Sequence, residues 1–283
     1  MLRVGCWASD TPPGRYAAVR RALHLDVPAP LRYLRWVAGL VHGDLGTSAR
    51  TDRPVTSIIG DRITSSLILA GLAFLAIVIV SLTLGLISGT RAGARTDRAI
   101  SVSGLIAVSL PEFILAGVFI AVLASWLVLL PSVSLVPAGG TPLDRPSILV
   151  LPVLTLTVAG SAYSMRLVRA AVIDASQLPH VEAARLCGLP PARVVLRHLL
   201  PSAVGPIAQV FAYLTGYLVG GAIVVERVFN YPGLGNLLVE SVNARDVTIV
   251  PGVGLLASAA VVGAFLAADL IGLAANPKIR IGA

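Results

Sequence analysis

The side chains that carry most enzyme and metal chemistry are few in this sequence and are not grouped. The histidines show no ligand spacing on one helix face, and they are His24, His42, His180 and His198. Cys6 and Cys187 lie far apart, without the CxxC spacing of metal and redox sites. The only lysine, Lys278, is not part of a G-x-x-x-x-G-K-[ST] phosphate-binding loop. We therefore expect no catalytic residue, no metal site and no bound ATP in this chain.

Two acids, Glu112 and Asp269, lie within long apolar stretches. An ionisable side chain in hydrocarbon is costly unless it faces protein or water. Glu112 follows Pro111, whose ring removes one backbone donor and leaves a helix carbonyl free. A hydrogen bond to a neighbouring helix and a position on a water-filled path would each accommodate Glu112, and the sequence leaves both open.

The composition excludes an ordinary soluble protein. Of 283 residues, 56% are hydrophobic and 27 are glycine, whereas 13% are charged. Soluble domains carry about 25% charged residues, so this chain has too little polar surface to cover a globule in water. The net charge of +8 would suit nucleic acid. In a membrane protein, however, excess arginine in the inner loops is the ordinary cause, and we expect the lipid bilayer and not nucleic acid as the partner.

Five stretches that are almost free of charge can each hold the roughly 20 apolar residues that cross a hydrocarbon core. They predict membrane-spanning helices at about 64–90, 99–130, 147–166, 200–225 and 247–273. The spans must be helices, because an open sheet would leave backbone groups unpaired in lipid and the ten-residue alternation of a membrane barrel is missing. The predicted fold class is therefore all-α, a polytopic membrane helical bundle, with residues 64–283 as its transmembrane domain.

The distribution of basic residues predicts the orientation. Ten basic residues follow the first span, the third span or the last span. The positive-inside rule places that side, and the C-terminus, in the cytoplasm. Residues 1–63 would then be extracytoplasmic although they carry nine arginines, and the first dozen residues have no apolar run that could start translocation. We therefore expect that a further membrane helix belongs upstream of this segment.

The loop at 167–199 carries the most specific pattern. Glu182-Ala183-Ala184, three residues, Gly188, nine residues and then His198-Leu-Leu-Pro201 resembles the EAA signature of permease subunits of bacterial ABC importers. Physically, 181–187 reads as a short helix of small and apolar residues that Gly188 ends. Such a helix suits docking into another protein, and an interfacial amphipathic helix without a partner is the alternative.

Three further segments resemble one branch of those importers, the dipeptide, oligopeptide and nickel permeases. They are 43–48, similar to G-D-L-G-x-S; 109–113, similar to S-x-P-x-F; and 226–235, similar to E-x-x-F-x-x-P-G-x-G. Arg245-Asp246 follows the last of them. The resemblance runs from about residue 20 to the end. Members of the branch usually have six helices, and the first of these is missing from the predicted spans.

The resemblance implies a type I importer permease fold and a set of site residues. The resemblance assigns ATPase coupling to Glu182, Ala183, Ala184, Gly188, His198 and Pro201. The translocation path would include Glu112 with Pro111, where a cationic group such as a peptide N-terminus would be favoured. The external loop motif comprises Glu226, Phe229, Pro232, Gly233 and Gly235. Asp269 matches an acid usual in the branch, and the resemblance favours its pairing with a basic loop residue.

The resemblance also implies the partners. They are a second homologous permease subunit, two cytoplasmic ATPase subunits that bind ATP and Mg²⁺, and an extracytoplasmic substrate-binding protein. The expected function is passage of di- or oligopeptides across the bacterial inner membrane, with no enzymatic activity in this chain. Nickel or another small solute stays open as the substrate. Two alternatives come from other functional classes. A polytopic membrane enzyme would need converging acids or metal ligands, and a secondary transporter would show internal repeats or more intramembrane charges.

Overall fold

The structure is a computed structural model that describes residues 27–48, 50–136, 140–246 and 248–275. Cys6, His24, Lys278 and the expectations about residues 1–26 lie outside the described residues. The described part is helical apart from turns and one isolated bridge between Thr47 and Pro54, which confirms the all-α prediction. The chain divides into two compact units, one of residues 1–61 with 240–253 and one of residues 62–239 with 254–283.

The first unit contains α2 (Ala29–Val41) and a loop that follows the G-D-L-G-x-S pattern. Gly43 and Gly46 have positive φ angles of 79° and 87°, which glycine adopts without strain. The buried Ser48 Oγ donates a hydrogen bond of 2.5 Å to Asp246, also buried, 198 positions along the chain. Two segments of the family resemblance, 43–48 and Arg245-Asp246, therefore meet in this unit.

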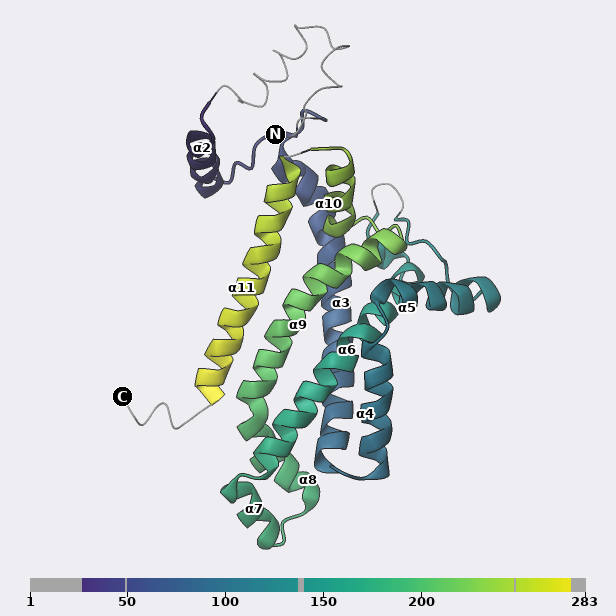
Figure 1. The fold of residues 1–283 in the computed structure, drawn as a ribbon, viewed down its shortest axis with the longest axis vertical. Helices are drawn as coiled ribbons and strands as arrows, with labels where there is room; N and C mark the ends of the chain where they lie inside the picture. Colours follow the sequence, from purple (N-terminus) through teal and green to yellow (C-terminus); the bar gives the residue numbers. More distant parts are fainter. Residues whose placement is uncertain (1–26, 49, 137–139, 247, 276–283) are drawn as a thin grey trace, which may run out of the picture. The chain divides into compact units, whose positions relative to one another are not determined.

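The second unit holds most of the remaining helices, and α3, α10 and α11 belong to both units. In chain order the helices are α3 (Val55–Thr90), α4 (Arg95–Val108), α5 (Glu112–Phe119), η1 (Ile120–Trp126), η2 (Pro142–Asp144), α6 (Ser147–Ser176), α7 (Pro179–Leu186), α8 (Pro191–Val194), η3 (Val195–Leu199), α9 (Leu200–Val228), α10 (Leu234–Asn243) and α11 (Ile249–Ala275). Within this unit α6 packs against α4, α5 and α9, and α7 and α8 lie at one end of these helices (Figure 1).

Four helical stretches among the described residues are long and apolar enough to cross a membrane: Val55–Thr90, Ser147–Ser176, Pro191–Val228 and Ile249–Ile271. The pair Arg95–Val108 and Glu112–Trp126 makes a fifth candidate if both count as one broken span. Large apolar side chains that are more than half exposed, such as Leu67, Ile106 and Leu266, lie on these helices. Exposed apolar surface of this kind requires lipid or a partner protein around it.

The predicted span at 99–130 is not one straight helix. The two helices of this segment meet at an angle of 99° around Ser109, Leu110 and Pro111. Pro111 disfavours helical backbone in the residue before it, so α4 ends there and a new helix starts. Glu112 is consequently the first residue of α5, directly after the break.

Close packing of α3 on α6 depends on two glycines one helical turn apart. A Cβ at Gly85 would lie 2.6 Å from Cγ1 of Val168, and one at Gly89 would lie 2.6 Å from Cγ1 of Val172. Such distances are shorter than any real contact, so no larger residue fits without a shift. Small residues at this spacing let helices approach closely in lipid. Gly85 and Gly89 let α3 and α6 approach in this way.

Candidate functional site

The short helix expected at 181–187 is present as α7, Pro179–Leu186, which starts two residues and ends one residue earlier than expected. Proline suits its first position because that residue needs no hydrogen-bond donor. At its end Cys187 N–H donates to the Ala183 carbonyl over 2.9 Å, and Gly188 N–H donates to the Arg185 carbonyl over 3.0 Å. Gly188 has a φ of 75°, which confirms that glycine ends the helix through its left-handed backbone.

The two faces of α7 differ in exposure. Val181 and Ala184 are buried in a cluster with residues of α6 and α9, including Val168, Val172 and Ala203. The outward positions Glu182, Ala183 and Leu186 are exposed, and the Leu186 side chain is 82% exposed. The helix is thus fixed to the long helices on one side, and its exposed side carries Glu182, Arg185 and the apolar Ala183 and Leu186.

His198 and Pro201 lie where α7 is tied to the start of α9. Nε2 of His180, on α7, lies 2.9 Å from Oγ of Ser202. The Ser202 hydroxyl donates to the His198 backbone carbonyl over 2.9 Å, so it accepts from the His180 ring. The structure therefore brings the 198–201 segment next to α7, although His198 contributes its carbonyl and not its ring to this contact.

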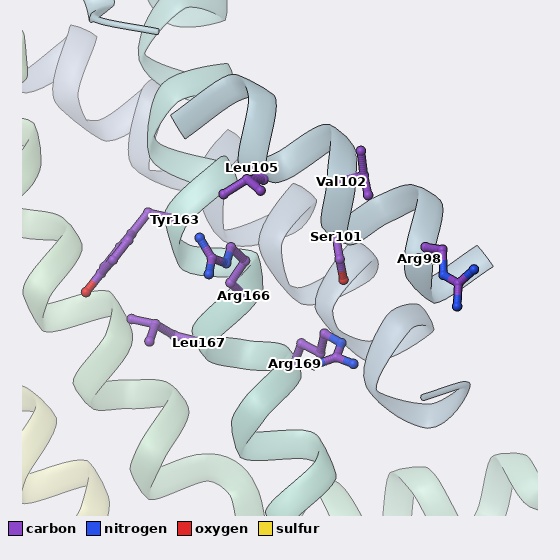
Figure 2. A pocket seen from close by; sticks show the side chains of 8 residues that line it. All are labelled: Arg98, Ser101, Val102, Leu105, Tyr163, Arg166, Leu167 and Arg169. Carbon is purple, nitrogen blue, oxygen red and sulfur yellow. The ribbon is translucent and has the colours of Figure 1, made fainter. Parts of the chain in front are cut away.

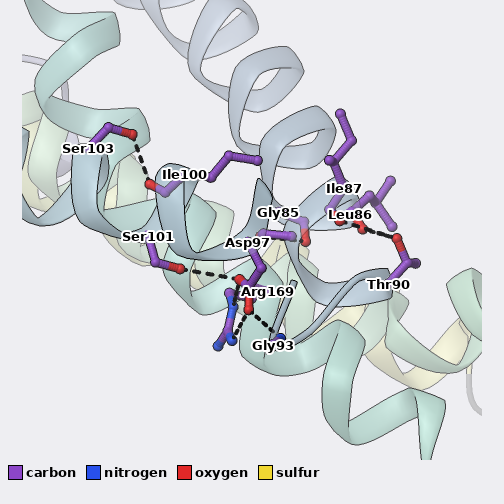
Figure 3. Close-up of polar contacts among 11 residues, drawn as sticks. Gly85, Leu86, Ile87, Thr90, Gly93, Asp97, Ile100, Ser101, Ser103 and Arg169 are labelled. Atoms are coloured by element: carbon purple, nitrogen blue, oxygen red, sulfur yellow. Dashed lines mark hydrogen bonds and ion pairs between the residues drawn. The ribbon is translucent and has the colours of Figure 1, made fainter. Parts of the chain in front are cut away.

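An ion pair that the sequence analysis missed joins the first turn of α4 to α6 (Figure 3). Asp97, buried, accepts from Nε of Arg169 over 2.6 Å and from Nη2 over 2.8 Å. The Asp97 carboxylate also accepts from Gly93 N–H over 2.8 Å and from Ser101 Oγ over 3.3 Å. The available signal was an acid within a basic loop, Asp97 between Arg95 and Arg98, which the positive-inside count passed over.

The motif at 226–235 is organised around the Glu226 carboxyl group, which is 1% exposed. One oxygen accepts from Ser66 Oγ over 2.7 Å, and the other accepts from Gly235 N–H over 2.7 Å and from Asn236 N–H over 3.0 Å. Ser66 Oγ in turn accepts from Leu234 N–H over 2.7 Å. Backbone N–H groups at the start of a helix have no partner within it. Glu226, from α9, and Ser66, from α3, therefore cap the start of α10.

The other residues of the motif shape this cap. A Cβ at Gly233 would lie 2.1 Å from Glu226 Oε1, and one at Gly235 would lie 2.6 Å from the Ile223 backbone Cα. Phe229 is fully buried in the core of the unit, while Pro232 is half-buried in the turn before α10. The sequence identified these residues as a motif, and the structure gives the glycines a packing role.

Tyr231, within the same turn, was not singled out by the sequence. Its side chain is fully buried, and its hydroxyl donates to the Ser65 carbonyl on α3 over 2.6 Å. Burial raises the pKa of the Tyr231 phenol above its ordinary value, so the hydroxyl keeps the proton that it donates. This contact fixes the α9–α10 turn to α3 beside the Glu226 cap.

The two intramembrane acids have different surroundings. Glu112 is half-buried at the start of α5 and interacts electrostatically with the Tyr217 hydroxyl of α9. That hydroxyl is buried. Asp269 of α11 accepts a hydrogen bond of 2.5 Å from the Gln209 amide on α9. Within the described residues Asp269 thus has a neutral donor from α9; Lys278 and Arg280 lie outside the described residues, so its pairing with a basic residue stays a prediction.

The helices, their apolar surfaces and the buried polar contacts between them define a polytopic α-helical membrane protein. Residues 81–281 match the family model described as the binding-protein-dependent transport system inner membrane component. The chain belongs to this family, whose members are multi-pass permease components of ABC importers in the inner membrane.

Curated relatives and solved structures agree with this assignment. The chain is 33% identical to a Brucella ovis protein named as a peptide permease, over 93% of this chain and 84% of that one. It is 35% identical to the glutathione transport system permease protein of Pectobacterium atrosepticum, over 93% and 83%. The fold resembles a chain of the MetNI methionine ABC transporter, with a TM-score of 0.64 and 21% identity over 77% of this chain and 96% of that one.

Among the residues that the structure describes, no three His, Cys, Asp or Glu side chains are grouped as metal ligands would be. The site residues thus fall into separate places: α7 with the 198–201 segment, the Glu226 cap and the break at Pro111. Each of them is built from contacts between long helices.

Proposed function

We propose that this chain forms part of the translocation path for di- or oligopeptides in an ATP-driven importer, and that α7 couples it to cytoplasmic ATPases. The relatives named as peptide and glutathione permeases support the substrate class. The single observation that carries the coupling role is the division of α7 into a buried face and an exposed one, with Leu186 82% exposed. An isolated apolar side chain at the tip of a short, anchored helix suits insertion into a partner's groove.

The anchoring of α7 gives the coupling a mechanical basis. Val181 and Ala184 pack into the same cluster as Val168 and Val172 of α6, and the His180 ring contacts Ser202 of α9. Displacement of α7 by a bound ATPase would therefore shift α6 and α9 with it, because a close-packed interior transmits strain. ATP and Mg²⁺ bind in the ATPases, and their closure on ATP drives the change of access in the permease.

The proposed assembly contains two permease subunits, two ATPase subunits and an extracytoplasmic binding protein that delivers the peptide. In the path, Glu112 is the residue of this chain that would favour a cationic peptide N-terminus. It is half-buried at the helix break after Pro111, and Tyr217 supplies a buried hydroxyl nearby. Broken helices near the membrane interior are a common way to place polar groups on a transport path.

Deletion of this gene in its own host, which supplies the partners, tests the function. The deletion is expected to reduce uptake of a labelled dipeptide, and the intact gene is expected to restore it. Unchanged peptide uptake would contradict the proposal, and a loss of nickel uptake instead would assign the other substrate class of the branch.

Variants of α7 in the same complementation assay test the coupling. Ala183→Trp, on the exposed face, and Gly188→Asp, at the left-handed helix end, are expected to abolish uptake while the protein stays in the membrane. Ala192→Trp adds the same side chain to an exposed position of α8 and serves as the matched control. Normal uptake by both α7 variants at normal expression would refute the coupling role.

We propose that the α7 end of the second unit and the C-terminus face the cytoplasm, with residues 1–63 on the outer side. In a background with both cysteines replaced by serine, an impermeant thiol reagent is expected to label Ser132→Cys and Asn243→Cys from outside intact cells, but not Thr96→Cys or Ala192→Cys. All four positions are exposed. The reverse labelling pattern would invert the topology and separate α7 from the ATPases.

A further inference from the structure

The short helix α2 (Ala29–Val41) carries exposed apolar side chains that the proposed function does not use. Leu31, Tyr33 and Leu34 are 43%, 64% and 61% exposed. A helix of 13 residues extends over about 20 Å, so α2 is too short to cross a hydrocarbon core of about 30 Å. Exposed apolar surface of this kind needs lipid or a partner protein to cover it.

The apolar and basic residues of α2 lie on opposite sides of the helix. Pro30, Tyr33, Leu34 and Val37 follow the three- and four-residue spacing that puts side chains on one stripe. Arg35 is exposed, and it lies two positions from both Tyr33 and Val37, which is about 160° around the helix from each. The sequence of α2 contains two arginines and no acid. The helix is therefore amphipathic, and its polar side is basic.

Two aromatic rings lie along the same helix. The ring centroids of Tyr33 and Trp36 are 6.3 Å apart. Tyrosine and tryptophan are enriched where membrane proteins pass from hydrocarbon to water. The groove between α4 and α6 shows the same combination of residue types on membrane helices, with Arg166 beside Tyr163 and Leu105 (Figure 2). Basic, aromatic and apolar side chains on one short helix thus suit the membrane boundary.

The segment after α2 ties this helix to the end of a membrane helix within the first unit. The Asp44 N–H donates to the Gly39 carbonyl of α2 over 2.9 Å. The next residue, Leu45, is buried, and a Cβ at Gly252 would lie 3.5 Å from its Cδ1. Gly252 lies in the first turn of α11, where the apolar stretch Ile249–Ile271 begins. The C-terminal end of α2 is therefore close to the level at which α11 enters the membrane.

We propose that α2 lies flat in the membrane surface, with Tyr33, Leu34 and Val37 toward the acyl chains and Arg35 toward the phosphate groups of the phospholipids. Helices with this division of residues lie with their apolar side about 5–10 Å into the boundary between headgroups and acyl chains. A soluble partner protein would also cover the apolar stripe, but the arginines, the aromatic pair and the short connection to α11 favour lipid. The outer leaflet follows from the proposed topology, whereas the flat position does not depend on it.

Quenching of tryptophan fluorescence by brominated phospholipid tests the position of each side of α2. The three tryptophans, Trp7, Trp36 and Trp126, are replaced by phenylalanine, and a single tryptophan is introduced as Tyr33→Trp or as Arg35→Trp. The full-length chain, with whatever subunits remain bound, is placed in nanodiscs of phosphatidylglycerol and phosphatidylcholine. Bromine is carried either near the ester end or near the methyl end of the acyl chains.

The expected result is a difference between the two sides of the helix. Tyr33→Trp is expected to emit at shorter wavelength than Arg35→Trp and to be quenched several-fold more by bromine near the ester end, because that bromine lies at the depth of an interfacial helix. Aqueous iodide is expected to quench Arg35→Trp more strongly. Both positions are exposed, so both variants are expected to keep the thermal unfolding midpoint of the tryptophan-free chain.

Leu72→Trp is the control for depth, because this exposed position lies midway along the membrane helix α3. It is expected to be quenched more by bromine near the methyl end than by bromine near the ester end. The same depth dependence for Tyr33→Trp would mean deep insertion of α2 and would overturn the proposal.

Three other results would also overturn it. Equal quenching of Tyr33→Trp and Arg35→Trp by bromine would mean that α2 presents no particular side to lipid. Quenching of both by iodide alone would place the helix in water, and protection of Tyr33→Trp from both quenchers would assign the apolar stripe to a protein contact. The measurement needs no transport, so failure of the chain to support peptide uptake would leave its outcome unchanged.

Discussion

Removal of the Glu226 carboxyl group is expected to be among the most destabilising single changes in the second unit. The carboxyl group accepts from Gly235 N–H, from Asn236 N–H and from Ser66 Oγ, and it is 1% exposed. Glu226→Ala would leave a cavity in place of the carboxyl group. Gly233 and Gly235 pack directly on the carboxyl oxygens, so the start of α10 would have to move to fill this cavity.

The magnitude follows from the donors that lose their acceptor. Ser66 can turn its hydroxyl toward another acceptor, but the two backbone N–H groups of Gly235 and Asn236 cannot turn. A buried donor left without a partner costs about 1–3 kcal/mol, so Glu226→Ala is expected to lower the free energy of unfolding by about 2–6 kcal/mol. Glu226→Gln keeps one oxygen for both N–H groups and can donate its amide to Ser66, so its expected cost is about 1 kcal/mol.

Titration of the purified chain with SDS in mixed micelles, followed by helical circular dichroism, measures these differences. Glu182→Ala is the matched control because it makes the same substitution at an exposed position of α7. Its effect on the free energy of unfolding is expected to stay within about 0.5 kcal/mol. If Glu226→Ala matched Glu182→Ala, or if Glu226→Gln cost as much as Glu226→Ala, the capping role derived from the hydrogen bonds would be wrong.

Two further substitutions test the contacts between α6 and its neighbours, with the same titration. Asp97→Asn is expected to cost about 2–4 kcal/mol, because it leaves the partly buried Arg169 without its counter-charge; an effect below about 0.5 kcal/mol would show that the pair is a solvated surface contact. Gly89→Val is expected to cost about 1–3 kcal/mol by overpacking against Val172. Gly71→Val, where a side chain would meet nothing within 4 Å, is the control, and an equal effect of the two valines would exclude packing as the cause.

The sequence predicted the membrane helices because composition alone determines which stretches can enter lipid. It did not predict the break within the 99–130 span, although the signal was present. Pro111 was read as the loss of one donor within a helix, whereas its restriction of the preceding residue ends α4. One kinked helix and two helices at 99° would have the same composition, so composition cannot distinguish them.

The contacts of the site residues were less predictable than the residues themselves. The motif around Glu226 was visible, but its partner Ser66 lies 160 positions away, on a helix that sequence reasoning treated only as an apolar span. Asp97 and Arg169 are 72 positions apart; Arg169 was counted only as loop charge, and Asp97 was passed over. Periodicity and spacing describe neighbours along the chain, so they cannot predict which side chains meet only when the helices pack.

The packing of α6 explains why the most specific pattern of the sequence lies in a loop. Val168 and Val172 approach Gly85 and Gly89 of α3, and both valines also belong to the cluster that buries Val181 of α7. The same turns of α6 therefore contact a membrane helix on one side and support the short loop helix on the other. A loop helix with such support keeps a fixed position relative to the membrane helices. Only with a fixed position could a force on its exposed face be passed to those helices.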